Sequence, residues 1–343
     1  MKSRQEVLEA LRVKIRLRHL ALSTEDAYLG WVSRYYDFAR RLPRDMESEA
    51  KVEAFLTDLA VNKSVAAKTQ NQALAALLFL YSNVLEKPLA RVSAMRAKVP
   101  ARERSAPSRE QVRIFRSVVR DTLQTPARLL VDLIYGTGMR VSEPLELRIK
   151  DVLWGEGQVV VRGAKGGKDR RVPIPRSCAE PLKAQIERAR GLWEWDRKHH
   201  PEVGVSLPDR LGVKFPSAPF NWQWFWVFPA AAHCQEPYTG KTVRYHLLVD
   251  AIQRAVREAA REVQLEGLIT PRALRHAFAT HTLAAGADVR TIAELMGHKS
   301  LETTAGYLHP EISSARSPLD DPFFDGGAPR RDQDGGRGGL RPE

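Results

Sequence analysis

The chain has 343 residues, of which 43% are hydrophobic and 28% are charged. This composition is typical of globular proteins and excludes disordered and fibrous ones. The 54 lysines and arginines exceed the 41 aspartates and glutamates, which gives a net charge of +13. An excess of this size favours a polyanionic partner such as nucleic acid, although a merely basic soluble protein would have the same composition.

The cysteine content and the lengths of the apolar runs indicate where in the cell the protein is expected. Only Cys178 and Cys234 occur, so no disulfide framework is predicted and the cytoplasm is the expected location. The charged N-terminal residues are unlike a signal peptide. No run approaches the ~18 apolar residues that span a bilayer, so no membrane partner is expected.

Helical patterns fill residues 1–98, which are predicted to form a helical DNA-binding domain. Ser23 and Thr24 are expected to cap a helix with apolar residues at three- and four-residue steps, and similar patterns cover 51–61 and 68–85. Polar residues at the start of the last pattern suit contacts with phosphate and sugar, although a solvated helix face would look the same. They are Lys68, Thr69, Gln70 and Asn71.

A basic, proline-punctuated stretch follows and marks a domain boundary. We predict a linker at 99–107, in which Arg102 and Arg104 are suited to cross a DNA backbone.

The second domain is predicted to span residues 108–315. Two strands rich in valine and isoleucine, 158–162 and 171–174, flank a glycine-rich basic hairpin tip that carries Lys165, Lys168 and Arg170. The remaining pattern is helical. Helices are expected after Ser108 and at about 179–195, 247–263, 275–285, 288–296 and 302–308. The tail, 316–343, is poor in hydrophobic residues and is expected to be partly disordered.

Several short motifs in this domain contain residues whose side chains could bind a phosphate or take part in catalysis. In Gly136-Thr-Gly-Met-Arg140-Val-Ser-Glu143, an arginine lies between two helices, where its guanidinium can hold a phosphate through two parallel hydrogen bonds. Each motif alone is more typical of an ordinary surface or core residue. The later ones are Leu274-Arg275-His276, Leu295-Met-Gly-His298 and Thr303-Thr-Ala-Gly-Tyr307.

Together and in this order, the motifs resemble those of the tyrosine recombinases, the family of phage integrases and Xer proteins. The resemblance runs from the helical N-terminal part to about Asp320. It implies a mainly α-helical fold with a small antiparallel β-sheet in the catalytic domain, and two domains that form a C-shaped clamp around DNA. It also implies a site-specific DNA recombinase that needs no metal, ATP or other cofactor.

The resemblance assigns a role to each motif. Tyr307 would attack the scissile phosphate and form a 3′-phosphotyrosyl link. Arg140 and Arg275 would hold the non-bridging oxygens and neutralise the charge that develops in the transition state.

Four further residues would complete the implied site. Lys165 would protonate the leaving 5′-oxygen, with Lys168 as the competing general acid. His298 would hydrogen-bond the phosphate, and Glu143 would hold the Arg140 region in position without contacting the phosphate itself.

One position departs from the family pattern. The family usually has histidine or lysine three residues before the second arginine, whereas this chain has Arg272. Arginine stays protonated, so it can donate to a phosphate but cannot accept the Tyr307 proton. Since base catalysis contributes ~10²–10⁴-fold, Arg272 predicts slower cleavage, unless another base compensates.

A long segment at about 191–247 is similar to the extra segment of integron integrases. Those enzymes recognise folded single-stranded cassette sites partly through extrahelical bases, and aromatic side chains are suited to stacking on unpaired bases. Candidate DNA contacts here are Trp222, Trp224, Arg244 and His246, although packing within the domain is the alternative for the tryptophans.

The same segment contains several residues that could suggest zinc, but their spacing matches no standard ligand pattern, so no metal is expected. These residues are His199, His200, His233 and Cys234.

The resemblance to integron integrases predicts an enzyme that integrates and excises gene cassettes, which is the function of a mobile genetic element. It would act on duplex attachment sites and on folded single-stranded cassette sites, as a homotetramer on DNA and a monomer without it. Leu319, Phe323 and Phe324 in the tail could anchor a neighbouring protomer or dock on their own domain. Alternatives are a phage- or Xer-like recombinase that acts only on duplex sites, a DNA-binding homologue weakened by Arg272, and a generic basic nucleic-acid binder.

Overall fold

The computed structural model describes residues 3–90, 106–164, 168–208, 211–237 and 239–297. It divides into two compact units, Met1–Arg104 and Ser105–Glu343. The division falls inside the segment 99–107, and each unit is described by itself below. Within the described residues, no helix is long and apolar enough to cross a membrane.

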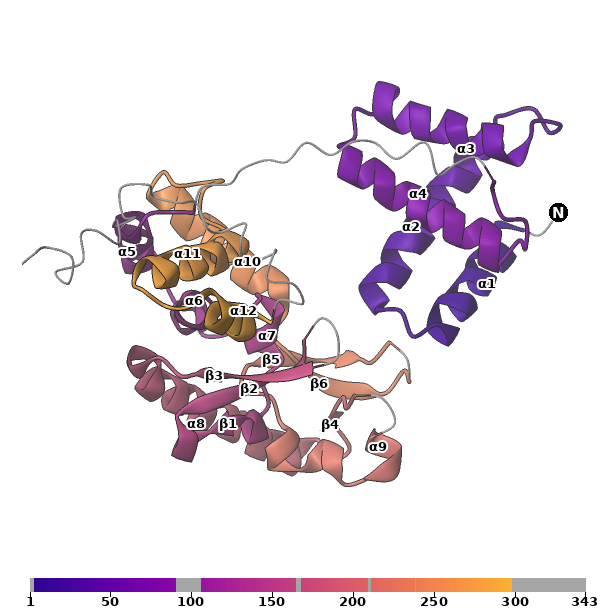
Figure 1. Cartoon of the computed structure of the whole chain (residues 1–343). Coiled ribbons are helices and arrows are strands. Elements are labelled where there is room, and N and C mark those ends of the chain that lie inside the picture. Colours follow the sequence, from indigo (N-terminus) through magenta and orange to yellow (C-terminus); the bar gives the residue numbers. More distant parts are fainter. Residues whose placement is uncertain (1–2, 91–105, 165–167, 209–210, 238, 298–343) are drawn as a thin grey trace, which may run out of the picture. The chain divides into compact units, whose positions relative to one another are not determined.

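The N-terminal unit is a bundle of helices (Figure 1). Its elements are α1 (Arg4–Leu17), α2 (Leu22–Ala39), α3 (Ser48–Thr57) with a π-helical turn at Asp58–Asn62, and α4 (Ala67–Asn83). The apolar stripes of these helices close on one another, and Leu11, Leu74 and Leu77 are almost fully buried. The predicted cap of α2 is wrong: the helix begins after Ala21, without a side-chain cap, and Ser23 and Thr24 lie within its first turn.

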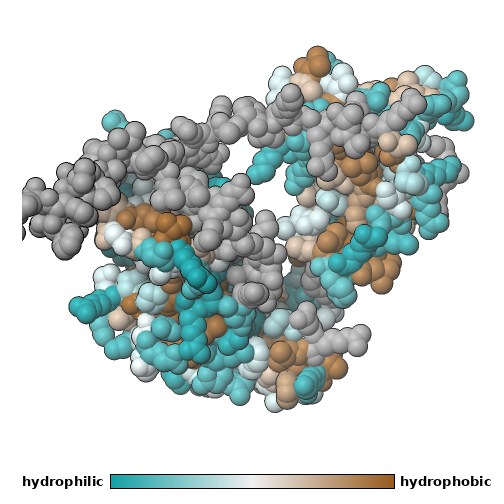
Figure 2. All heavy atoms as spheres, viewed as in Figure 1, coloured by the Kyte–Doolittle hydropathy of each residue, from teal (hydrophilic) through white to brown (hydrophobic). Residues whose placement is uncertain are grey.

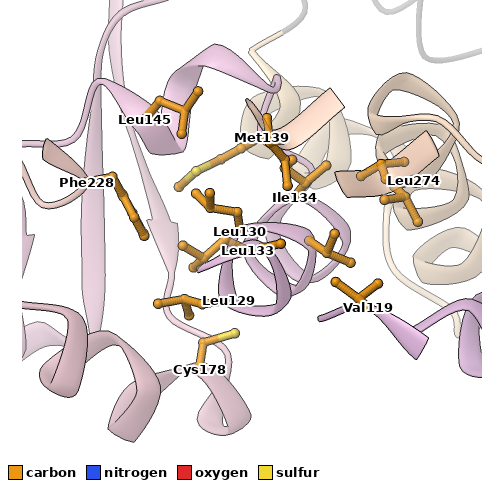
Figure 3. Packing of buried hydrophobic residues seen from close by; sticks show 14 of the residues in the cluster. Val119, Leu129, Leu130, Leu133, Ile134, Met139, Leu145, Cys178, Phe228 and Leu274 are labelled. Atoms are coloured by element: carbon orange, nitrogen blue, oxygen red, sulfur yellow. The ribbon is translucent and has the colours of Figure 1, made fainter. Parts of the chain in front are cut away.

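The core of the second unit surrounds α6 (Ala127–Thr137) (Figure 3). Leu130, Leu133 and Ile134 of this helix are fully buried, as expected for a helix that is apolar on most of its circumference. The helices around it are α5 (Arg109–Val118), α8 (Arg176–His199), α10 (Val249–Glu262) and α11 (Pro271–Ala284). The first of them starts with a capping box between Ser108 and Gln111.

A three-stranded antiparallel sheet lies beside these helices, in the order β1 (Val152–Leu153), β2 (Gln158–Ala164) and β3 (Lys168–Pro173). It contains the predicted hairpin, with Val159 opposite Val172. Successive side chains of a strand point to opposite faces. In β3, Val172 is buried and Arg171 is exposed, so Arg170 shares the inward face of Val172.

A second sheet, which the sequence did not lead us to expect, occurs in the segment 191–247. Its order is β4 (Gly204–Val205), β6 (Thr242–His246) and β5 (Pro229–Gln235), and the β4–β6 pair is parallel. Short helices connect these strands. They are α9 (Leu211–Lys214) and 3-10 turns at Ala218–Phe220 and Trp222–Trp224. The predicted fold, mainly helical with a small antiparallel sheet, is confirmed.

Candidate active site

The site begins where α6 ends, at a turn that only glycine can make. Gly138 has a left-handed backbone (φ +68°), and a Cβ built on it would lie 2.4 Å from the Phe278 ring of α11. This close approach turns the chain back toward α11. Arg140 and the short helix α7 (Ser142–Leu145), which carries Glu143, follow directly.

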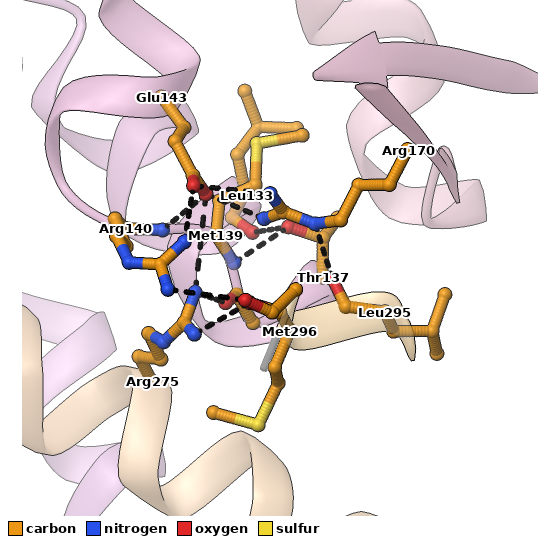
Figure 4. Close-up of polar contacts among 11 residues, drawn as sticks. Leu133, Thr137, Met139, Arg140, Glu143, Arg170, Arg275, Leu295 and Met296 are labelled. Carbon is orange, nitrogen blue, oxygen red and sulfur yellow. Dashed lines mark hydrogen bonds and ion pairs between the residues drawn. The ribbon is translucent and has the colours of Figure 1, made fainter. Parts of the chain in front are cut away.

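The Glu143 carboxylate lies at the centre of three guanidinium groups (Figure 4). Its Oε2 accepts from the Arg140 backbone at 2.7 Å, and Arg140 Nη1 donates to Oε1 at 2.8 Å. Arg170, on β3, donates to both oxygens, with Nη1 at 3.0 Å and Nη2 at 2.5 Å. Arg275, on α11, places Nη1 3.8 Å from Oε2. Glu143 thus supports Arg140 and two further arginines from distant parts of the sequence.

The same three arginines hold the end of α12 (Val289–Met296). Arg170 Nε donates to the Leu295 carbonyl at 2.6 Å, and Arg275 Nη2 donates to the Met296 carbonyl at 2.6 Å. Arg140 Nη2 donates to the next carbonyl, that of Gly297, at 3.3 Å. The last carbonyls of a helix have no partner within the helix, and cations stabilise that end. Three consecutive carbonyls are therefore capped by three different arginines.

The charge of this cluster is suited to an anion. Three guanidinium groups face one carboxylate, which leaves a formal excess of two positive charges. Burial raises the pKa of Glu143, but the hydrogen bonds and charge of Arg170, and then those of Arg140, outweigh burial and hold the pKa below its ordinary value. The Arg140 side chain remains 32% exposed, so a phosphate can approach its guanidinium.

Arg272 lies in the first turn of α11, which starts at Pro271 behind a Thr270 cap. It is exposed and stands three residues before Arg275. Residues at this spacing are neighbours on a helix surface, so α11 carries both arginines on one side.

Several predicted features lie outside the described residues. They are Lys165, His298 and Tyr307 of the implied site, Arg102 and Arg104, the expected helix at 302–308, and the tail with Leu319, Phe323 and Phe324.

Comparisons with known proteins agree with this architecture. The sequence pattern of the phage integrase family matches residues 107–313, and that of the N-terminal SAM-like domain of phage integrases matches residues 7–91. The chain belongs to the phage integrase family. An integrase/recombinase of Escherichia coli is 40% identical to this recombinase over 321 residues, which cover 92% of this chain and 93% of the relative.

Further relatives agree with a tyrosine-type site-specific recombinase. The tyrosine recombinase XerA of Thermococcus kodakarensis is 35% identical over 226 residues, 65% of each chain. A lambda integrase dimer bound to a core site has a TM-score of 0.60 at 16% identity, and covers 91% of this chain and 98% of that one. XerH bound to its difH substrate has a TM-score of 0.57 at 21% identity, and covers 90% of this chain and 80% of that one. The solved structures share the fold of this recombinase, which is a tyrosine-type enzyme.

Three expected DNA contacts are corrected by burial. The Arg244 side chain is enclosed, with Nε donating to Asp196 Oδ2 at 2.8 Å and Nη1 donating to the Ala231 carbonyl at 2.6 Å. His246 is buried, and its Nδ1 lies 2.8 Å from the Leu247 carbonyl. The Arg170 side chain is 9% exposed and engaged with Glu143. Burial and these contacts argue against Arg170, Arg244 and His246 as DNA contacts. Arg275 is also buried, and its Nη1 donates to the Gly138 carbonyl at 2.6 Å, so its contact with the phosphate stays a prediction of the family resemblance.

The two candidate tryptophans are mainly packing residues. Trp222 lies against Trp193 and Phe225, and the Arg190 guanidinium is 4.6 Å from its ring centre. Lys150 Nζ lies 2.9 Å from the ring centre of Trp224. Their ring faces are thus largely occupied within the domain.

The polar candidates of the N-terminal unit lie at the start of α4. Lys68 is exposed, and Thr69 and Asn71 are half-buried. Gln70 donates to the Leu56 carbonyl at 3.2 Å, so part of its side chain serves packing. Lys168 is the first residue of β3.

The contribution of Arg170 was not predicted, although the sequence contains a signal for it. Val172 is an apolar strand residue, and the side chain two positions earlier lies on the same face. Alternation along β3 therefore directs Arg170 toward the core, away from solvent. No group of three or more histidine, cysteine or acidic side chains that could hold a metal occurs among the described residues.

Gly297 offers a test of this arrangement. It follows α12 with a left-handed backbone (φ +63°), and a Cβ built on it would lie 3.1 Å from Arg170 Nη1. We expect Gly297→Ala to lower the free energy of unfolding by about 1–2 kcal/mol, from the backbone, and also to slow strand cleavage by displacing Arg170.

The matched control is Gly157→Ala, because Gly157 has nearly the same backbone (φ +62°) but no atom within 4 Å of the added Cβ. Urea unfolding should show similar losses for the two variants, whereas a cleavage assay should show slowing for Gly297→Ala alone. Equal cleavage rates would show that the Gly297–Arg170 contact is unimportant.

Proposed function

We propose that this recombinase is an integron integrase, which breaks and rejoins DNA through a 3′-phosphotyrosine intermediate and so integrates and excises gene cassettes. The observation that carries the proposal is the segment 191–247. It has its own sheet and its own apolar cluster, centred on Val205, Phe225 and Trp226, and it exposes aromatic rings.

The segment is firmly held on the catalytic unit. The Val227 backbone donates to the Leu147 carbonyl at 2.9 Å, and Ile149 donates to the Phe225 carbonyl at 3.0 Å. Between these bonds, the buried Arg148 guanidinium lies 3.7 Å from the ring centre of Trp226. It also donates to the carbonyl of Trp224 at 2.6 Å. A rigid attachment of this kind fits a recognition surface, since a preorganised surface loses little entropy on binding.

Exposed large hydrophobic side chains of the segment occur on α8, in and after α9, and on the following turn. They are Trp195 (47% exposed), Val213 (80%), Phe215 (50%) and Phe220 (36%). Hydrophobic residues at the surface beside α9 are visible in Figure 2. An exposed ring can stack on an unpaired base, so Trp195, Phe215 and Phe220 replace Trp222 and Trp224 as our candidates for contacts with extrahelical bases.

The proposed chemistry uses the arginine cluster as a phosphate clamp. Tyr307 gives its hydroxyl proton to solvent or to a base other than Arg272, which cannot accept it, and its oxygen attacks phosphorus. The bond from phosphorus to the 5′-oxygen breaks, and a 3′-phosphotyrosyl link remains. Lys165 supplies the proton that the leaving 5′-oxygen takes up. Arg140 and Arg275 hold the non-bridging oxygens as charge develops, and His298 donates a further hydrogen bond.

We further propose that the two units clamp the DNA, that Lys68 and the start of α4 contact its backbone, and that four protomers assemble on two sites in the cytoplasm. The supporting observation is the match of each unit to its own part of one family.

A trapping experiment tests the proposal. The recombinase is incubated with a folded single-stranded cassette site and with its duplex form, each nicked so that cleavage leaves a covalent protein–DNA band. We expect an adduct that favours the folded strand and is absent from Tyr307→Phe. Equal or greater adduct on the duplex would favour a phage- or Xer-like recombinase.

A matched pair of variants tests the exposed rings. Since one stacked base is worth ~1–3 kcal/mol, Phe215→Ala should weaken binding to the folded strand by about 5- to 100-fold and leave duplex binding unchanged. Trp154→Ala is the control, because Trp154 is also exposed (41%) but lies outside the segment. Equal losses on both DNA forms would argue against base stacking by Phe215.

A further inference from the structure

Arg170 makes three directed hydrogen bonds from a nearly buried position. Two go to the two oxygens of Glu143 and the third goes to the Leu295 carbonyl. A guanidinium has its donors in a rigid plane, so a bidentate grip fixes the angle of the carboxylate as well as its distance. Lysine, with one nitrogen, cannot reproduce this geometry.

The carboxylate that Arg170 grips also determines where Arg140 lies. Oε1 of Glu143 accepts from both Arg170 and Arg140, so rotation of the carboxylate would move the Arg140 guanidinium. Oε2 lies 3.8 Å from Arg275. The relative placement of Arg140 and Arg275 therefore depends on the orientation of one carboxylate.

Arg170 also joins two parts of the chain that are distant in sequence. Its own strand, β3, follows the hairpin tip, and its Nε–H holds the last turn of α12. Gly297, directly after α12, accepts from Arg140 and precedes His298 in the sequence. A displacement of Arg170 would consequently affect β3, Glu143 and the end of α12 together.

We propose that Arg170 is a positioning residue for strand cleavage, which holds the Glu143 carboxylate so that Arg140 and Arg275 present their guanidinium groups to the scissile phosphate at a fixed separation. The proposal rests on the proposed role of these two arginines as the phosphate clamp. It replaces the expectation that Arg170 contacts DNA.

The two roles predict different measurements. A phosphate contact contributes to affinity, and its loss lowers the slope of log Kd against log salt by about one. A positioning residue acts through the geometry of other groups, and a misplacement of about 1 Å can cost ~10²-fold in rate. Binding and cleavage therefore have to be measured separately.

The test uses the full recombinase and a duplex site that is selected from random-sequence DNA for binding to the recombinase and is then nicked. A duplex is used so that the result does not depend on a preference for folded single strands. Single-turnover cleavage is measured at saturating protein, and Kd is measured over a range of salt. We expect Arg170→Met to cleave ~10²-fold more slowly, with Kd within about twofold of wild type and an unchanged salt slope. Arg170→Lys should recover part of the rate.

A double variant shows whether Arg170 acts through Glu143. If it does, Arg170→Met combined with Glu143→Gln should cleave no more slowly than Glu143→Gln alone, within about threefold. The double variant leaves one fewer unpaired cation than Glu143→Gln alone, which favours folding. Arg171→Met is the matched control, since Arg171 is the next residue of β3, is 59% exposed and pairs with Glu156. It should cleave at the wild-type rate.

Three results would overturn the proposal. A weaker Kd with a salt slope lower by about one would identify Arg170 as a phosphate contact. A wild-type cleavage rate for Arg170→Met, or rate losses that multiply in the double variant, would show that Arg170 does not act through Glu143. Tyr307→Phe, run alongside, separates a failure of the proposed chemistry from a failure of the proposed role of Arg170.

Discussion

Replacement of Glu143 by glutamine is expected to lower the free energy of unfolding by about 3–5 kcal/mol, because it leaves the buried guanidinium groups of Arg170 and Arg275 without their anion. Six of the seven tryptophans lie in the second unit, so tryptophan fluorescence during urea unfolding reports mainly on that unit. Glu110→Gln is the control, since Glu110 forms an exposed ion pair with Arg113, and it should leave the urea midpoint unchanged.

The loss of stability caused by Glu143→Gln should become smaller as the pH falls. The folded-state pKa of Glu143 is lowered from 4.5, so its contribution is complete above about pH 4.5 and is lost as pH falls through the folded-state pKa. The stability difference between wild type and Glu143→Gln should therefore be largest at neutral pH and shrink below about pH 4.5. A difference that stays constant across this range would show that the carboxylate is not held in its charged form by the arginines.

Replacement of Arg272 by histidine is expected to accelerate single-turnover cleavage by ~10²-fold, the lower end of what a general base contributes. Arg272 is exposed on the first turn of α11, three residues before Arg275, and the change keeps the helix and its Thr270 cap. An imidazole at this position can accept the Tyr307 proton, which a guanidinium cannot. The cleavage rate of the variant should also rise with pH around 6.5, where histidine becomes neutral.

Arg272→Gln is the matched control, because glutamine removes the charge without supplying a base. If histidine and glutamine give equal rates, charge removal and not proton transfer explains the change. If histidine does not accelerate cleavage, proton acceptance is not the limiting step and another group serves as the base. Binding without any adduct in the wild type, with cleavage restored by Arg272→His, would identify a DNA-binding homologue that has lost its base.

Periodicity predicted most of the secondary structure because the signal is local. Apolar residues at three- and four-residue steps predicted α4, α10 and α12, and the valine-rich strands predicted the β2–β3 hairpin. Prediction failed where pairing is not local. The β4–β6 pair joins strands that are far apart in sequence, and β4 has only two residues, so no periodic pattern could reveal it.

The helix start of α2 shows a related limit. Ser23 and Thr24 have the side chains that usually cap a helix, yet the helix begins earlier, after Ala21. A good capping residue favours a start at one position, but helix ends vary by one or two residues, so a nearby serine or threonine does not by itself determine the start.

By itself the sequence determined the family, because ordered motifs are a property of the chain and need no coordinates. It also predicted a domain boundary at 99–107 and named Arg140 and Arg275 as candidates for the site. Only the tertiary structure decided what each charged residue does. From the sequence, Arg170 and Arg244 are equally suited to contact DNA. In the structure, Arg170 is paired with Glu143 and Arg244 is paired with Asp196, and both side chains are nearly buried. The reason is physical: a charge is buried when a partner from elsewhere in the chain satisfies it, and that partner is brought close only by folding.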